Sequence, residues 1–139
     1  MPTPSRPTGP SHPTGPDAPR RLVNTRELIS GAKTTAPGAV WKLEEPVRDL
    51  DSNVVSLPAG DGIQAHQGPT LDVLIHVLDG SGTLGTEDGD LPLRAGDLVW
   101  MPRHALRSFT AGADGLIYHT VHQRKPGLQL QAQRPDAGR

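Results

Sequence analysis

The sequence contains no cysteine, and aromatic residues make up only 3% of it. Without cysteine the protein cannot use a disulfide framework, a cysteine nucleophile, a thiolate zinc site or an iron–sulfur cluster. No apolar run approaches the roughly 20 residues that a membrane-spanning helix needs. The N-terminal residues hold no apolar stretch of the kind found in signal peptides, which predicts a cytoplasmic location.

An excess of charge of either sign is also absent. Lys and Arg number 14 and Asp and Glu number 15, for a formal net charge of -1. Proteins that bind nucleic acid or an anionic membrane surface through charge need a clustered basic patch, and the sequence has none. We therefore expect neither nucleic acid nor a membrane as a partner.

The length of 139 residues leaves room for one domain. Residues 1–20 hold seven of the 15 prolines, and their only apolar residues are Met1 and Ala18. Such a segment buries too little apolar surface to offset its ordering entropy. The composition predicts a disordered Pro-rich tail over 1–20, a single domain over 22–133 and a loose C-terminal tail over 134–139. A PxxP ligand for an SH3-like groove is the alternative interpretation of the first tail.

Short apolar runs separated by turn residues dominate the rest of the chain. Asn24, with Glu27 three residues later, predicts a capping box for one short helix that ends at Gly31. The Asp-Gly dipeptides at 79–80 and 88–89 are typical of hairpin turns. Many short strands with closely spaced turns predict an all-β antiparallel sandwich or barrel. The predicted strands are 40–43, 52–57, 62–66, 71–78, 81–86, 91–94, 97–101, 104–110, 115–122 and 127–131.

The predicted strand 71–78 is apolar on both faces. Its alternating side chains form two sets, Val73, Ile75 and Val77 on one face and Leu74, His76 and Leu78 on the other. Both faces are therefore expected to be covered. One face would meet the barrel core. The other would meet a second layer or another subunit, which predicts a homodimer.

Two stretches of the sequence share a pattern of glycine, histidine and proline. The first runs from Gly60 through His66 to Gly80, within Val-Leu-Asp-Gly-Ser-Gly, and the second runs from Gly96 through Pro102 to Arg107. These stretches resemble the paired motifs of the cupin superfamily, whose members are small jelly-roll barrels. The resemblance covers about residues 50–122. It implies an antiparallel jelly-roll barrel, to which the capping box adds one short N-terminal helix.

The resemblance does not extend to the metal ligands. Cupins usually hold a divalent transition metal with three His and one Glu, a donor set that suits Fe, Mn, Ni, Cu or Zn. Of these four positions only His66 matches, and the other three are occupied by Gly68, Val73 and Arg107. A guanidinium has no lone pair to donate to a metal. We therefore expect no cofactor at the usual site.

Two other ligand sets stay open. In the first, a bulge before Gly80 would turn Asp72 and His76 inward together. The second draws on the other half of the barrel, with His104, His119 or His122. Either would make a metal-dependent cupin enzyme, a dioxygenase or an isomerase, with a divalent transition metal. The alternative ligands are then His66, Asp72, His76 and His122.

Arg107 occupies a position whose side chain points into the barrel in cupins, and a buried Arg needs an anionic partner. The candidates are Asp72 and an anionic ligand. The resemblance and these residues together predict a protein that binds a small organic anion without metal, in a binding role or as an isomerase or cyclase-type enzyme with His66 as base. The expected ligand-binding residues are Arg107, His66, Val73, Ile75, Val77, Trp100 and Met101. A non-catalytic structural or regulatory dimer is the other possibility.

Overall fold

The computed structural model describes residues 18–32 and 37–124. In these residues one helix, α1 (Thr25–Ala32), precedes seven strands. The strands are β1 (Gly38–Lys42), β2 (Leu50–Leu57), β3 (Gly62–Gln67), β4 (Val73–Thr86), β5 (Gly89–Arg94), β6 (Leu98–Met101) and β7 (Leu106–Gln123). The predicted strand 127–131, the tail 134–139 and most of the tail 1–20 lie outside the described residues. The described part contains no helix that is long and apolar enough to cross a membrane.

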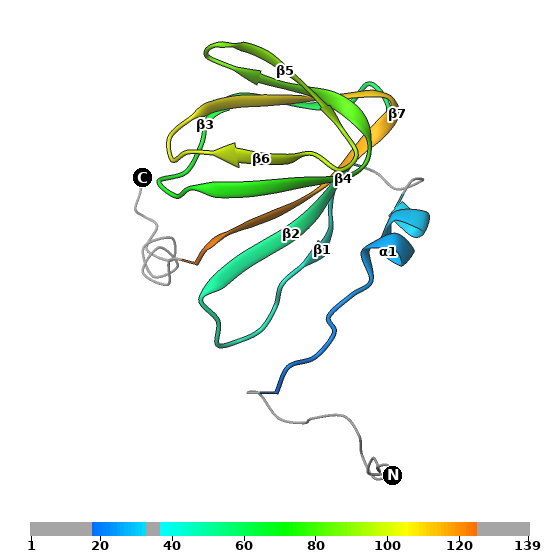
Figure 1. Ribbon diagram of the computed structural model, residues 1–139, viewed down its shortest axis with the longest axis vertical. Helices are drawn as coiled ribbons and strands as arrows, with labels where there is room; N and C mark the ends of the chain where they lie inside the picture. The colour runs from blue at the N-terminus through cyan, green and yellow to red at the C-terminus, as the bar shows by residue number, and fades with distance from the viewer. Residues whose placement is uncertain (1–17, 33–36, 125–139) are drawn as a thin grey trace, which may run out of the picture.

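The antiparallel strands form two layers, because β4 and β7 each pass from one layer into the other (Figure 1). In what we call the β2 layer, β1, β2, the second half of β7, the first half of β4 and β6 lie side by side. In the β3 layer the order is β3, the first half of β7, the second half of β4 and β5. The prediction of an all-β antiparallel jelly-roll with one short N-terminal helix is confirmed.

The main core lies between the two layers. Val73, Ile75 and Val77 of β4 face it, as predicted, and are 5%, 1% and 0% exposed. Burying an aliphatic side chain of this size contributes about 1.5–3 kcal/mol. Phe109 from the β3 layer stacks on Tyr118 from the β2 layer, with ring centroids 4.8 Å apart. This aromatic pair joins the layers directly.

The predicted breaks within β4 and β7 are wrong, because each of these is one continuous strand. The sequence predicts a hairpin turn at 79–80 and separate strands on either side, but β4 runs on through two register shifts, one between Val77 and Asp79 and one between Gly80 and Gly82. Gly80 has a φ of 80°, and a Cβ on it would overlap the carbonyl of Gly115. Glycine here permits a bulged crossing of two strands rather than a turn. The predicted strands 104–110 and 115–122 are likewise one strand, β7.

Helix α1 covers part of the outer face of the β2 layer (Figure 1). Its cap is the predicted one, because the Glu27 N–H donates to Asn24 Oδ1 at 3.1 Å. The helix continues past Gly31 to Ala32. A second apolar cluster lies under it, formed by Leu28, Ile29, Ala32, Val40, Trp41, Val54, Leu78 and Ile117. Leu78 is thus covered within the chain, while Leu74 and His76 of the same face are exposed.

Candidate functional site

A cavity of about 230 Å³ opens between the layers, where β3 ends and β4 begins. Its apolar walls are Val55, Ile63, Pro69, Val73, Ile75, Met101 and Phe109. Its polar lining residues are Asn53, His66, Arg107, Tyr118, Thr120 and His122. An apolar cavity in which a few polar side chains converge is the usual form of a small-molecule site.

His66 reaches the inner face because β3 contains a bulge. Ile63 pairs with Phe109 and His66 with Arg107, so three residue steps on β3 match two steps on β7. Without this extra residue, His66 and Ile63 would face opposite sides of the sheet. The exposed imidazole stands at the cavity mouth, and its Nδ1–H donates to the carbonyl of Gln64 at 2.9 Å. Since a carbonyl only accepts, the neutral ring keeps its lone pair on Nε2, which can act as a base.

Arg107 is the most deeply buried charge of the cavity, with 6% of its surface exposed. Its Nε donates to the carbonyl of Ala105 at 3.3 Å. Within residues 18–32 and 37–124, its Nη2 is buried and has no hydrogen-bond partner. Burial lowers the pKa of Arg107 from its ordinary value, yet a guanidinium stays charged in a protein. An unpaired buried cation is costly, and an anion in the cavity would satisfy it.

Gly68 makes room for this guanidinium. A Cβ on Gly68 would overlap the Arg107 side-chain atoms Cζ, Nη2 and Nε. The Gly68 N–H also donates to the Ala105 carbonyl at 2.9 Å, the same carbonyl that accepts from Arg107 Nε. The glycine and the arginine therefore form one unit, of which Arg107 lines the cavity.

Two further polar groups lie on the β2 layer. Burial raises the pKa of the Tyr118 phenol far above its ordinary value, so the hydroxyl stays protonated and can donate a hydrogen bond. The Thr120 hydroxyl donates to Asn53 Oδ1 at 2.6 Å across the β2–β7 pair. These groups supply neutral polar contacts opposite Arg107.

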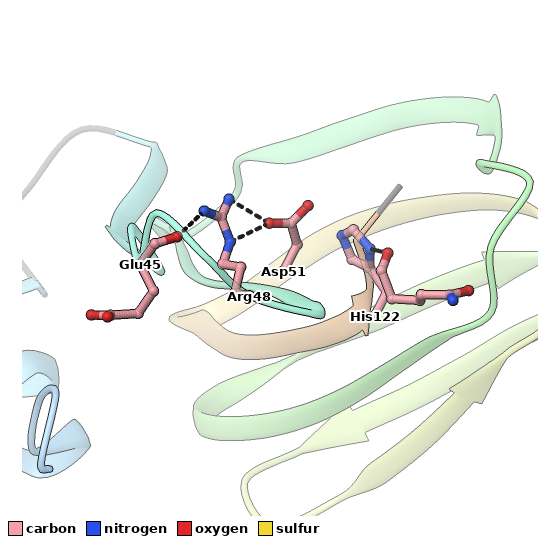
Figure 2. Close-up of polar contacts among 5 residues, drawn as sticks. Glu45, Arg48, Asp51 and His122 are labelled. Carbon is pink, nitrogen blue, oxygen red and sulfur yellow. Dashed lines mark hydrogen bonds and ion pairs between the residues drawn. The ribbon is translucent and has the colours of Figure 1, made fainter. Parts of the chain in front are cut away.

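A second arginine, Arg48 in the segment before β2, is neutralised within the protein. Arg48 Nε and Nη2 donate to Asp51 Oδ1 at 3.0 and 2.7 Å (Figure 2). Asp51 pairs across the strands with His122, whose Nδ1–H donates to the carbonyl of Gln123 at 2.9 Å. His122 thus also presents Nε2 as its basic nitrogen. Arg48 has its carboxylate, whereas the structure shows no carboxylate partner for the buried Arg107 among residues 18–32 and 37–124.

Solved structures superpose on this two-layered barrel. A cupin-2 domain protein from Shewanella frigidimarina matches at a TM-score of 0.58 and 16% identity, over 74% of this chain and 95% of its own. A cupin protein from Bacteroides fragilis matches at 0.52 and 23% identity, over 63% and 78%. The chain has the cupin fold. A cupin-superfamily sugar phosphate isomerase from Silicibacter pomeroyi matches at 0.51 and 21% identity, over 58% of this chain and 54% of its own. No protein-family model and no curated protein matches the sequence.

The usual cupin metal site does not fit this cupin barrel. Gly68 offers no side chain, Val73 forms apolar wall, and Arg107 places a cation where a ligand would stand. In the part of the chain that the structure describes, no group of three His, Asp or Glu side chains could hold a metal ion. Of the four residues at the ligand positions, His66 is therefore the one that could donate an electron pair to a metal ion.

The first alternative ligand set is wrong. The register shift of β4 lies after Val77, so Val73, Ile75 and Val77 stay inward and His76 is exposed on the outer face. Asp72 Oδ1 accepts the backbone N–H of Arg103 at 2.9 Å, and its Oδ2 lies 3.6 Å from Arg103 Nη2. The backbone hydrogen bond lowers the pKa of Asp72 most. Asp72 is therefore the partner of Arg103 and not of Arg107.

The second alternative set is also not brought together. His119 lies on the outer face, where its Nε2 is 2.6 Å from Ser52 Oγ. His104 occupies the turn before β7 with a φ of 66°, a conformation that favours glycine. Only His122 joins His66 in the lining of the cavity.

The expected ligand-binding residues divide into two groups. His66, Val73, Ile75, Met101 and Arg107 line the cavity together. Val77 is buried deeper in the core and does not reach the lining. One of Trp100 and Met101 is expected in the apolar wall. Met101 lies there, and Trp100 is 61% exposed on the outer face. The alternation of β6 puts Met101 inside and therefore Trp100 outside.

Several lining residues escaped the sequence analysis. They are Asn53, Val55, Ile63, Pro69, Phe109 and Thr120. Asn53 carries a usable signal, because it shares the strand face of Val55 and Leu57 and interrupts that apolar stripe with an amide. Tyr118 and His122 are predicted to share a face, and only the register shows that this face is the inner one.

Proposed function

We propose that this barrel binds a small organic anion and transfers a proton on it, as an isomerase or cyclase-type enzyme does. The observation that carries the proposal is the buried Arg107, whose Nη2 lacks a hydrogen-bond partner among the described residues and which lines the cavity. A guanidinium is well suited to a carboxylate or an enolate, since its planar donors match two oxygens.

Each polar group has a distinct task in the proposed reaction. Arg107 holds the anionic group, and the Tyr118 hydroxyl donates to it. His66 Nε2 accepts a proton from the carbon next to the bound carboxyl or carbonyl group, and the electron pair moves onto oxygen beside the guanidinium. The same imidazolium then returns the proton to a different atom, which completes an isomerisation without a redox partner.

The structural comparison supports this only as a precedent. The Silicibacter pomeroyi protein is a sugar phosphate isomerase built on the same fold. Its identity of 21% carries no residue assignments to this chain. The proposal stands on the polar groups of the cavity itself.

Binding is tested by calorimetry with pyruvate, citrate and a sugar phosphate. We expect at least one to bind, and Arg107→Met to weaken it by about 30-fold or more, because a buried charge pair loses one partner. Arg94→Met, at an exposed position of β5, is the matched control and should bind like the wild type. Equal affinity in wild type and Arg107→Met would contradict the proposed site.

Proton transfer is tested by following deuterium incorporation into the bound acid by NMR in D₂O. We expect His66→Gln to slow incorporation at least 100-fold while binding is retained. His76→Gln makes the same change on the outer face and should have no effect. Unchanged exchange in His66→Gln would show that His66 is not the base, and no exchange with the wild type would limit the protein to a binding role. One equivalent of transition metal in the wild type, lost in His66→Ala, would instead favour a metal enzyme.

A further inference from the structure

A second hollow adjoins the cavity on the other side of Arg107. It measures about 450 Å³ and lies between the edge strands β5 and β6. In the described part of the chain, β5 and β6 pair with successive halves of β4 and not with each other, so the barrel wall is open there. We call this opening the β5–β6 groove. Its apolar lining is formed by Leu84, Leu91, Val99, Trp100, Met101 and Leu106.

The groove and the cavity share two residues. Met101 and Arg107 line both, so the two spaces are adjacent at these residues. The cavity alone, at about 230 Å³, is smaller than the roughly 300–1,000 Å³ that organic ligands usually occupy. Both spaces have mixed linings. Besides the shared Met101 and Arg107, the polar residues of the groove are Thr86, Glu87, Asp88, Arg103 and His104, and its apolar residues offer a contact surface for an alkyl or aryl group.

We infer that the anion is an amphipathic monocarboxylic acid. Its carboxylate meets Arg107, its polar head lies in the cavity, and its alkyl or aryl tail lies in the β5–β6 groove. The inference rests on the proposed function and names its substrate class. Glu87 and Asp88 stand on the groove rim at the tip of the β4–β5 hairpin. Their carboxylates disfavour a second anionic group near the hairpin tip, and the Arg103 guanidinium, which also lines the groove, already lies 3.6 Å from Asp72 Oδ2.

The test is calorimetry with butanoate, hexanoate and octanoate, each below its aggregation concentration. We expect the affinity to rise about two- to fourfold per methylene, since each buried methylene adds apolar area. Octylammonium has the same tail and the opposite charge, and we expect it not to bind. Arg107→Met should weaken all three acids.

Substitutions in the groove test where the alkyl tail of the acid binds. Leu91→Glu places a charge in the groove at a side chain that is 43% exposed, so the fold should tolerate it. We expect it to abolish the gain with chain length while butanoate binds as before. Leu106→Glu, on the opposite side of the groove and 38% exposed, should do the same. Leu50→Glu is the matched control, because Leu50 is 51% exposed and lines a different apolar groove between β2 and the segment before α1.

The outcomes separate this inference from the proposed function. If butanoate binds through Arg107 but affinity is flat with chain length, the tail assignment is wrong and the anion site stands. A chain-length gain that survives Leu91→Glu and Leu106→Glu, or is lost in Leu50→Glu, places the tail elsewhere and also overturns the inference. If no carboxylate, citrate or sugar phosphate binds, both proposals fall.

Discussion

Arg107 and Gly68 depend on each other. The Arg107 guanidinium lies against Gly68, and a Cβ at position 68 would overlap its Cζ, Nη2 and Nε atoms. Arg107 can therefore hold this position only while residue 68 is glycine. Together the two residues place a fixed positive charge in the lining of the cavity.

Replacing Arg107 by methionine should stabilise the fold while it destroys anion binding. Methionine has a comparable length and no donor to leave unpaired, and a buried unsatisfied donor costs about 1–3 kcal/mol. We expect the melting temperature without ligand to rise by several degrees. Thermal unfolding with and without the tightest-binding acid measures both effects. A melting temperature below that of the wild type would show that the guanidinium already has a partner.

Gly68→Ala should remove anion binding with little loss of stability. Its Cβ would meet only the movable Arg107 side chain at the closest points, so the guanidinium gives way rather than the backbone. We expect affinity to fall at least tenfold, measured by calorimetry, with an unchanged circular dichroism spectrum. Gly31→Ala is the control, because nothing lies within 4 Å of its Cβ position in α1. It should bind normally and gain about 0.4–1 kcal/mol.

At the level of helices and strands, the sequence predicted features that depend on neighbouring residues better than features that depend on contacts between distant strands. Asn24 and the Asp-Gly dipeptide at 88–89 act within a few residues, and both the cap and that hairpin are found where the sequence predicts them. The bulge of β3 depends on which strand lies alongside, so periodicity alone could not place His66 inward. In β4 the register shifts come after Val77, so the predicted alternation already puts His76 on the face opposite Val73, Ile75 and Val77. The Gly68–Arg107 fit is a contact between distant strands and left no local signal.

The outer face of the β2–β7–β4 ladder should make stability depend on pH. His119 pairs across the strands with His76, bonds to Ser52 and lies 6.4 Å from the ring of Trp41. Burial first, and His76 second, lower the pKa of His119 below its unfolded value of 6.5. His119 also lines the apolar groove between β2 and the segment before α1, and the cations Arg20 and Arg21 line that groove too.

The lowered pKa of His119 decides the direction in which stability changes with pH. The unfolded chain binds the proton more readily, so the contribution of His119 is fully present above about pH 6.5 and is lost as the pH falls toward the lower folded pKa. We expect the free energy of unfolding, from urea titrations, to be smaller at pH 5.5 than at pH 7.5. His119→Gln should reduce that difference. A difference that persists unchanged in His119→Gln would assign it to other groups.

At the scale of the whole molecule, the uncovered part of the outer face should mediate a homodimer. Leu74 pairs with Trp100 and His76 with Leu98, so these side chains form one patch. Leu74, Leu98 and Trp100 are 41%, 65% and 61% exposed, and a patch of this kind usually marks an interface.

Light scattering after size-exclusion chromatography should therefore give about twice the chain mass of 14.8 kDa. Trp100→Glu should give the mass of one chain, because it places a charge at the centre of the patch. Val47→Glu changes a residue that is 93% exposed in the loop before β2 and should leave the dimer intact. A wild-type protein that runs as a monomer at micromolar concentration would exclude this interface.

The passage of β4 and β7 through both layers has a consequence for how the molecule opens. Neither layer can separate without disrupting a strand that the other layer also uses, so unfolding should be a single all-or-none transition. Backbone amides in the middle of β4 and β7 should then exchange with solvent only when the whole domain unfolds. Those of β1 and β5, which each pair with one neighbour in the described part of the chain, should exchange through local fraying at much lower cost.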